Sequence, residues 1–69
     1  MDIKDQIRSM KLAEADFVTR AQSEIDKTMD RIEEGKYAEA LVYLHKAKSN
    51  LINAHESREQ GRQLEASGS

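Results

Sequence analysis

The short stretch EEGKY, residues 33–37, decides how this chain folds. Its glycine, Gly35, can adopt the left-handed backbone conformation that satisfies the last carbonyl groups of a helix. The sequence on both sides of it follows a helical pattern, and the chain contains no proline. The stretch therefore predicts that one helix ends here and that a second helix begins after a short turn.

Upstream of this turn, apolar residues recur at the helical period of about 3.6 residues. Asp2 or Asp5 can cap the start of this segment, because a carboxylate there accepts hydrogen bonds from the free amide groups of the first turn. We therefore expect a first helix over about 2–34. Its apolar stripe consists of Ile3, Ile7, Met10, Ala13 or Glu14, Phe17, Ala21, Ile25, Thr28 or Met29, and Ile32.

Downstream of the turn, the same period selects a second apolar stripe. It consists of Tyr37, Leu41, Leu44, Ala47 or Lys48, Leu51 and His55, with Ala40, Ile52 and Ala54 widening it. Beyond His55 the sequence ESREQGRQLEASGS is strongly polar. We expect a second helix over about 36–61 that frays near Gly61, followed by a disordered tail over 62–69.

A connection this short makes the two helices antiparallel neighbours. The sequence thus predicts an all-α fold, an antiparallel two-helix hairpin that forms one domain over 1–62 with its turn at 34–36. Pairing outward from the turn sets Ile25 near Leu44. The residues expected to shape the turn are Gly35, Tyr37 and Ala40.

The small size of the chain predicts self-association. A domain of 69 residues buries only about 60% of its unfolded surface, and this chain has no cysteine with which to form disulfides. Oligomerisation is the remaining source of stability, most simply a homodimer that forms a four-helix bundle. The expected interface residues are Ile3, Ile7, Met10, Phe17, Val18, Ile25, Tyr43, Leu44, Leu51 and Ile52.

The composition narrows the class of protein. Charged residues make up 35% of the chain and aromatic residues 4%, which is typical of long helices and coiled coils. Eleven basic against thirteen acidic side chains leave no basic footprint for nucleic acid. No apolar run approaches the roughly 20 residues of a membrane span, and residues 1–11 lack the apolar core of a signal peptide. We expect a cytoplasmic protein with a protein partner.

Few residues suggest chemistry. His55 lies beside the apolar stripe and an imidazole there can serve as acid, base or nucleophile, although a histidine at a stripe margin is more often only solvated. His45 lies about 280° around the helix from it, so the two do not share a metal ion. The carboxylate edge formed by Asp26, Asp30 and Glu33 or Glu34 is largely neutralised by Lys27 and Arg31. The chain holds no phosphate loop, nucleophile elbow or metalloprotease motif, and we expect no cofactor and no metal.

The segment GKYAEALVYLHKAKSNLINAH, residues 35–55, resembles the second helix of the IIA components of the lactose and chitobiose phosphotransferase system. The residues that carry the resemblance are Gly35, Tyr37, Ala38, Ala40, Ala47, Ala54 and His55, together with Ala21 and Ser23 upstream. The resemblance implies that His55 is a phosphoryl acceptor, in a trimer of three-helix subunits. Arg20 and Arg58 depart from the family pattern, and its third helix has no counterpart in these 69 residues.

The segment EGKYAEALVYLHKA, residues 34–47, also resembles the second helix of a tetratricopeptide repeat and of microtubule-interacting-and-trafficking domains. In these families the resemblance implies close approach of two helices through small residues. The sequence therefore leaves two functions open. The first is a non-enzymatic interaction or adaptor protein that self-associates and docks on a partner, and the second is a phosphocarrier that uses His55.

Overall fold

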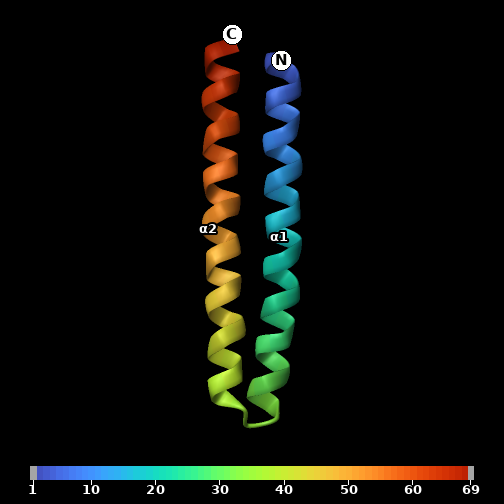
Figure 1. Ribbon diagram of the computed structural model, residues 1–69, viewed down its shortest axis with the longest axis vertical. Coiled ribbons are helices and arrows are strands. Elements are labelled where there is room, and N and C mark those ends of the chain that lie inside the picture. Colours follow the sequence, from blue (N-terminus) through green and yellow to red (C-terminus); the bar gives the residue numbers. More distant parts are fainter. Residues whose placement is uncertain (1, 69) are drawn as a thin grey trace.

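The computed structural model describes residues 2–68, which form two long helices side by side (Figure 1). Helix α1 spans Ile3–Glu33 and helix α2 spans Tyr37–Gly68, and the chain reverses direction between them. The result is a rod of 51 × 14 × 13 Å. The prediction of an all-α antiparallel hairpin is confirmed.

The helix ends follow from the sequence. The carboxylate of Asp2 accepts a hydrogen bond from the backbone N–H of Lys4 at 3.4 Å and so caps α1. At the turn, Gly35 has a φ of 73°. Its N–H donates to the carbonyl of Ile32 at 3.0 Å, and the N–H of Lys36 donates to the carbonyl of Arg31 at 2.8 Å. This pair of bonds is a Schellman motif, which satisfies the last carbonyls of α1 and fixes the reversal.

The far end of α2 differs from the sequence-based expectation. The helix does not fray near Gly61, and the prediction of a disordered tail is wrong for residues 62–68, since α2 continues to Gly68. The physical reason is that α1 lies alongside this segment. A Cβ atom added at Gly61 would lie 3.5 Å from Cβ of Met10, and one added at Gly68 would lie 3.1 Å from Cδ1 of Ile3. Ser69 is outside the described residues.

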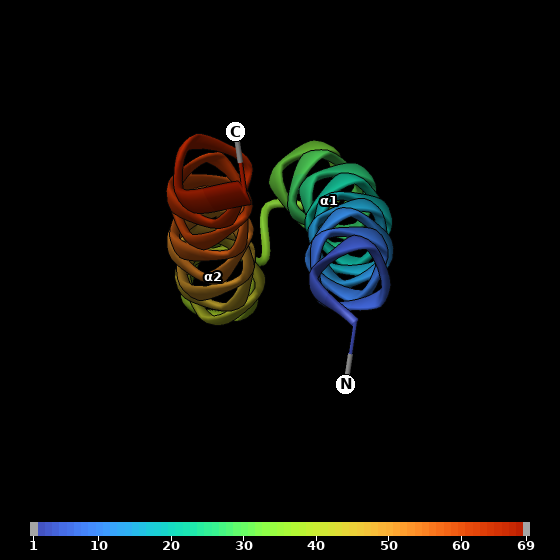
Figure 2. The same ribbon diagram turned by 90° about the horizontal axis from the view of Figure 1, so that it is seen from above.

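The seam between the helices is built from small residues. On α2, every seventh residue is buried and has little or no side chain: Ala40, Ala47, Ala54 and Gly61. On α1 the buried residues are Ala21 and Thr28. A seven-residue repeat is the pattern of helices that wind around each other, and Figure 2 shows the two helices crossing. Among the described residues no large side chain is fully buried.

Half-buried residues fill the positions between these small ones. On α2 they are Tyr43, Asn50, Asn53, Ser57, Glu59 and Leu64, and on α1 they are Ile3, Gln6, Ile7, Met10, Ala13, Glu14, Phe17, Val18, Glu24 and Arg31. Several of them are polar, and the amide of Asn50 donates to the carboxylate of Glu24 across the seam. The seam therefore positions the helices closely but leaves the large apolar residues of α2 outside it.

Candidate interaction surface

The large apolar residues gather in one groove beside the turn. Two hollows share Leu44: one is lined by Thr28, Ile32, Tyr37, Ala40, Leu41 and Leu44, and the other by Ile25, Leu44, Ala47, Lys48, Leu51, Ile52, His55 and Glu56. Because Leu44 lines both, they form one continuous surface, which we call the turn-proximal groove. Its large apolar residues are all exposed: Ile25, Ile32, Tyr37, Leu41, Leu44, Leu51 and Ile52.

The helical repeat explains why these side chains face outward. On α2, Leu44 follows Leu41 by three residues and Leu51 follows Leu44 by seven, so the three leucines share one stripe. The stripe that contains Ala40 and Ala47 lies beside it, about 40–100° away around the helix. Since the alanine stripe is the one packed against α1, the leucine stripe is left at the surface, and Leu44 keeps 50% of its area exposed.

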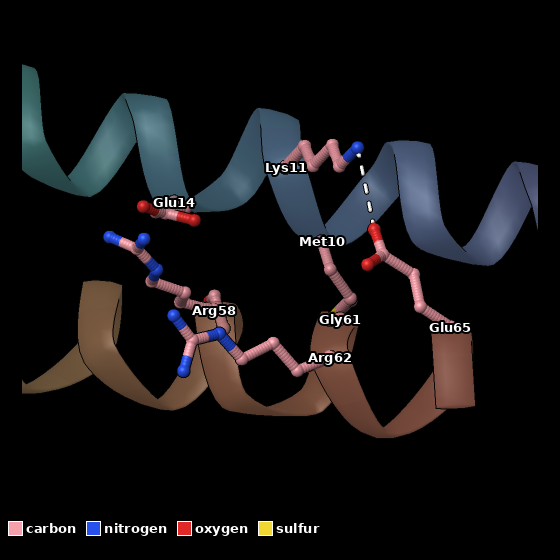
Figure 3. A pocket seen from close by; sticks show the side chains of 8 residues that line it. Met10, Lys11, Glu14, Arg58, Gly61, Arg62 and Glu65 are labelled. Atoms are coloured by element: carbon pink, nitrogen blue, oxygen red, sulfur yellow. Dashed lines mark ion pairs between the residues drawn. The ribbon is translucent and has the colours of Figure 1, made fainter. Parts of the chain in front are cut away.

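The same face becomes charged toward the ends of the hairpin that lie away from the turn. Lys11, Arg58 and Arg62 line a hollow there with Glu14 and Glu65 (Figure 3), and Nζ of Lys11 lies 3.4 Å from Oε1 of Glu65. Arg58 and Arg62 continue the leucine stripe of α2 at helical spacing. On α1 the same spacing places Lys4 and Arg8 in line with Lys11. We call these five basic residues the basic end.

The opposite face of the hairpin is polar. Its main hollow is lined by Thr19, Arg20, Ser23, Glu24, Lys27 and Asn50. A second hollow, on the distal half of the hairpin, mixes polar residues with the apolar side chains of Met10 and Leu64; its other lining residues are Gln6, Ser9, Gln60, Gln63 and Ser67. The large apolar residues are thus gathered mainly on one face, close to the turn.

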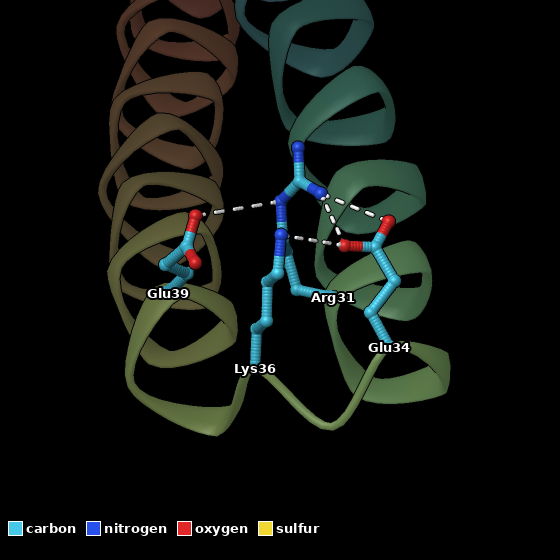
Figure 4. A network of polar contacts seen from close by, with 4 residues as sticks. All are labelled: Arg31, Glu34, Lys36 and Glu39. Atoms are coloured by element: carbon cyan, nitrogen blue, oxygen red, sulfur yellow. Dashed lines mark hydrogen bonds and ion pairs between the residues drawn. The ribbon is translucent and has the colours of Figure 1, made fainter.

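Ion pairs hold the turn itself in place (Figure 4). The guanidinium of Arg31 donates to both carboxylate oxygens of Glu34, at 3.0 and 2.8 Å, and its Nε lies 3.8 Å from Oε1 of Glu39. Nζ of Lys36 lies 3.2 Å from Glu34. The hydrogen bonds from Lys36 and Arg31 lower the pKa of the Glu34 carboxyl, and the bond to Glu34 raises the pKa of Arg31. These contacts join the end of α1 to the start of α2.

The expected interface residues divide into two groups. Ile25, Leu44, Leu51 and Ile52 line the groove, as a docking surface requires. Half-buried positions along the hairpin hold the rest: Ile3, Ile7, Met10, Phe17, Val18 and Tyr43. Tyr43 already has partners within the chain, because the centroid of its ring lies 5.6 Å from Nζ of Lys27 and 5.6 Å from Nζ of Lys46.

Two groove residues lie outside the expected interface set. Tyr37, expected to shape the turn, is the first residue of α2, and its exposed side chain also lines the end of the groove, whereas Ala40 is buried in the seam. Leu41 was assigned to the apolar stripe without being counted in the interface. Stepping back from Leu44 by three and then four residues reaches Leu41 and Tyr37, and this spacing was the signal that identifies them.

The candidate chemical residues are dispersed. His55 is exposed at the edge of the groove, and His45 is exposed as well. Within residues 2–68, no group of three or more His, Cys, Asp or Glu side chains is arranged to hold a metal ion. No helix over the same residues is long and apolar enough to cross a membrane. Comparison with family models, with curated proteins and with solved structures yields no match to the chain.

Proposed function

We propose that this chain is a small, non-enzymatic helical interaction protein that acts in the cytoplasm by burying its turn-proximal groove in a larger helical bundle. The observation that supports this function is the groove itself: a row of large apolar side chains lies exposed on a hairpin whose own seam is closed by alanines. Exposed apolar surface that is continuous and bordered by polar residues marks a site for another protein. Self-association and docking on a partner both cover such a face.

The exposed area has the right size for one interface. The chain exposes 5236 Å², whereas a compact monomer of its mass is expected to expose about 4,400 Å². The excess of about 800 Å² equals what one partner contributes to an interface of standard size. Each half-exposed leucine or isoleucine of the groove would gain about 1 kcal/mol on burial.

The test compares two leucines that differ only in place. Leu44 lies in the groove, while Leu12 on α1 is 66% exposed and lines none of the hollows described above. Sedimentation equilibrium at micromolar concentration is expected to show an assembly for the wild type and for Leu12→Glu, but a monomer for Leu44→Glu. Circular dichroism should report similar helix content in both variants. A wild-type chain that stays monomeric and binds no helical partner contradicts the proposal.

A second candidate function is phosphoryl transfer, supported by the position of His55. The imidazole is exposed, as an acceptor must be, and Lys48 and Arg58 share its stripe, where they would offset the charge of a phosphoryl group. In this function a ring nitrogen of His55 attacks the phosphoryl group of a carrier protein and the carrier's histidine leaves. Incubation with the carrier and phosphoenolpyruvate should give acid-labile phosphate that is lost in His55→Ala. Labelling that survives this substitution rejects the role.

A further inference from the structure

We infer that the distal half of the hairpin, the half away from the turn, sets the rotation of both helices about their own axes and so keeps the turn-proximal groove open. The inference goes beyond the proposed function, because it concerns the hairpin itself and does not depend on what covers the groove. It follows from the way the side chains change along the two rows of residues that border the seam.

The groove-side row is apolar near the turn and charged in the distal half. Ile25 lies four positions after Ala21, and Leu44 lies four positions after Ala40, which is about 40° around each helix. Continued every seven residues from the turn outward, the row holds Ile32, Ile25, Val18, Lys11 and Lys4 on α1, and Tyr37, Leu44, Leu51, Arg58 and Glu65 on α2. Lys11, Arg58 and Glu65 line one hollow (Figure 3), so the rows of both helices lie on the same side of the seam.

The far-side row changes in the opposite sense. It lies three positions after each seam residue, which is about 60° around the helix in the other direction. From the turn outward it holds Arg31, Glu24, Phe17, Met10 and Ile3 on α1, and Tyr43, Asn50, Ser57 and Leu64 on α2. Near the turn the amide of Asn50 donates to the carboxylate of Glu24, whereas Met10 and Leu64 line one hollow in the distal half. This row is therefore mostly polar near the turn and mostly apolar away from it.

The two halves consequently favour different rotations. If each helix turned by about 40°, the groove-side rows would become the seam. Near the turn this rotation would bury Ile25, Leu44 and Leu51, which are now 38%, 50% and 47% exposed, and burial of apolar area is favourable. The turn-proximal half, taken alone, would gain by closing its own groove.

The distal half opposes this rotation. The present seam has one charged position there, the half-buried Glu14, whereas the rotated seam would have four: Lys4, Lys11, Arg58 and Glu65. Burial of charged groups is costly, and the same rotation would turn Met10 and Leu64 away from the seam. The observed packing is thus the one that the distal half favours.

The continuity of the helices carries this preference to the turn. Helix α1 runs without a break over Ile3–Glu33 and α2 over Tyr37–Gly68, and the chain has no proline at which either helix could kink. Both halves therefore share one rotation. Lys11, Arg58 and Glu65 act as positioning residues, which hold the groove open without lining it.

An exchange of neighbouring residues in the distal half tests the inference without changing the composition. In the variant Met10→Lys/Lys11→Met/Leu64→Glu/Glu65→Leu, apolar side chains move to the groove-side row and charged side chains move to the far-side row. The matched control is Asp5→Leu/Leu12→Asp. It exchanges a charged and an apolar residue that are both exposed, lie seven positions apart on α1 and belong to neither row.

The reactivity of a single introduced thiol with a maleimide reports which side chains face the seam, because the chain has no cysteine of its own. Ala47→Cys reports the seam and Leu51→Cys reports the groove, since the parent side chains are 2% and 47% exposed. In the otherwise wild-type chain and in the control, Ala47→Cys should react about tenfold more slowly than Leu51→Cys. In the exchanged chain the order should reverse. Labelling is carried out at a dilution at which sedimentation shows a monomer, so that no second molecule protects the groove.

Unchanged reactivities in an exchanged chain that keeps its helix content by circular dichroism overturn the inference, because the turn alone would then set the rotation. Equal changes in the exchanged chain and in the control overturn it as well. If the exchanged chain loses helix content, Lys11→Met/Glu65→Leu takes its place, since it keeps Met10 and Leu64. This milder variant should raise the reactivity of Ala47→Cys about threefold, and protection equal to that in the control overturns the inference.

These outcomes are separate from those of the proposed function. Thiol labelling measures one dilute chain, whereas docking is tested by the effect of Leu44→Glu on assembly. A groove that the distal half does not control can still bind a partner, and a groove that binds nothing can still be held open by the distal half.

Discussion

The two stripes of α2 carry opposite kinds of side chain. The stripe that faces α1 repeats small residues every seven positions, from Ala40 to Gly61, whereas the neighbouring stripe holds Tyr37, Leu41 and Leu44. Small residues let two helices approach closely and so fix their geometry, but they bury little apolar area. The difference shows that the inner stripe determines the shape of the hairpin and leaves the outer stripe available for assembly.

Placing a large apolar side chain in the inner stripe should have the largest effect on stability. Ala47 is 2% exposed in the seam, and Ala47→Leu should destabilise the hairpin by about 1–3 kcal/mol because the added atoms force the helices apart. Lys48→Leu, one residue along and in the groove, adds a similar side chain and should not lower stability. Urea unfolding followed by circular dichroism measures both. A loss of stability that is equal in the two variants would contradict the division of α2 into two stripes.

The sequence predicted the hairpin because its determinant is local. Gly35, followed by the Schellman motif, needs no information from the rest of the chain. The division of α2 was missed because a stripe traced at 3.6 residues is broad enough to include both Ala40 and Leu44, which are neighbours on one helix face. The repeat of small residues at seven positions identifies the seam, whereas their apolar character alone does not.

The distal part of α2 was missed for a different reason. Its polar composition was interpreted as disorder, although the N-terminal half of α1 supplies Ile3 and Met10 as packing partners for Gly68 and Gly61. Such a partner is visible only when two segments far apart in the sequence are placed side by side. The surface was predicted in part: Ile25, Leu44, Leu51 and Ile52 were expected in the interface, whereas Tyr37 and Leu41 were placed in the apolar stripe without being counted in the interface.

Truncating the outer stripe should weaken assembly and spare the hairpin. Leu44→Ala would lose about 1 kcal/mol of burial in each copy, or about 2 kcal/mol per symmetric dimer, which corresponds to roughly 30-fold in the dissociation constant. Leu12→Ala, away from the groove, should leave that constant unchanged. Analytical ultracentrifugation over a concentration series provides the measurement. A fall in the urea midpoint of a dilute, monomeric sample would instead assign Leu44 to the inner seam.

Two glycine substitutions should change the stability of the hairpin in opposite directions. Gly61→Ala should stabilise the chain by about 0.5–1 kcal/mol, because alanine favours the helix and its Cβ would meet Met10 at an ordinary contact distance of 3.5 Å. Gly35→Ala should destabilise it by about 1–2 kcal/mol, since the left-handed backbone at 73° opposes any Cβ. Thermal unfolding followed by circular dichroism measures both changes. A destabilising Gly61→Ala would show that α1 packs against Gly61 too closely to admit a Cβ atom.

The smallest expected effect concerns the ion pairs that align the two stripes at the turn. The pKa of the Glu34 carboxyl is lowered by its hydrogen bonds from Lys36 and Arg31, so its contribution to stability is present above the usual carboxyl pKa of about 4 and is lost as the pH falls through the lowered value. Glu34→Gln should therefore be slightly less stable than the wild type at neutral pH, and the two should converge in acid. Glu33→Gln is the control, since its side chain lies outside this network. Because Glu34 and Lys36 are exposed and Arg31 is only half-buried, salt should reduce the difference. A gap between the wild type and Glu34→Gln that persists at low pH and high salt would assign the role of Glu34 to packing rather than charge.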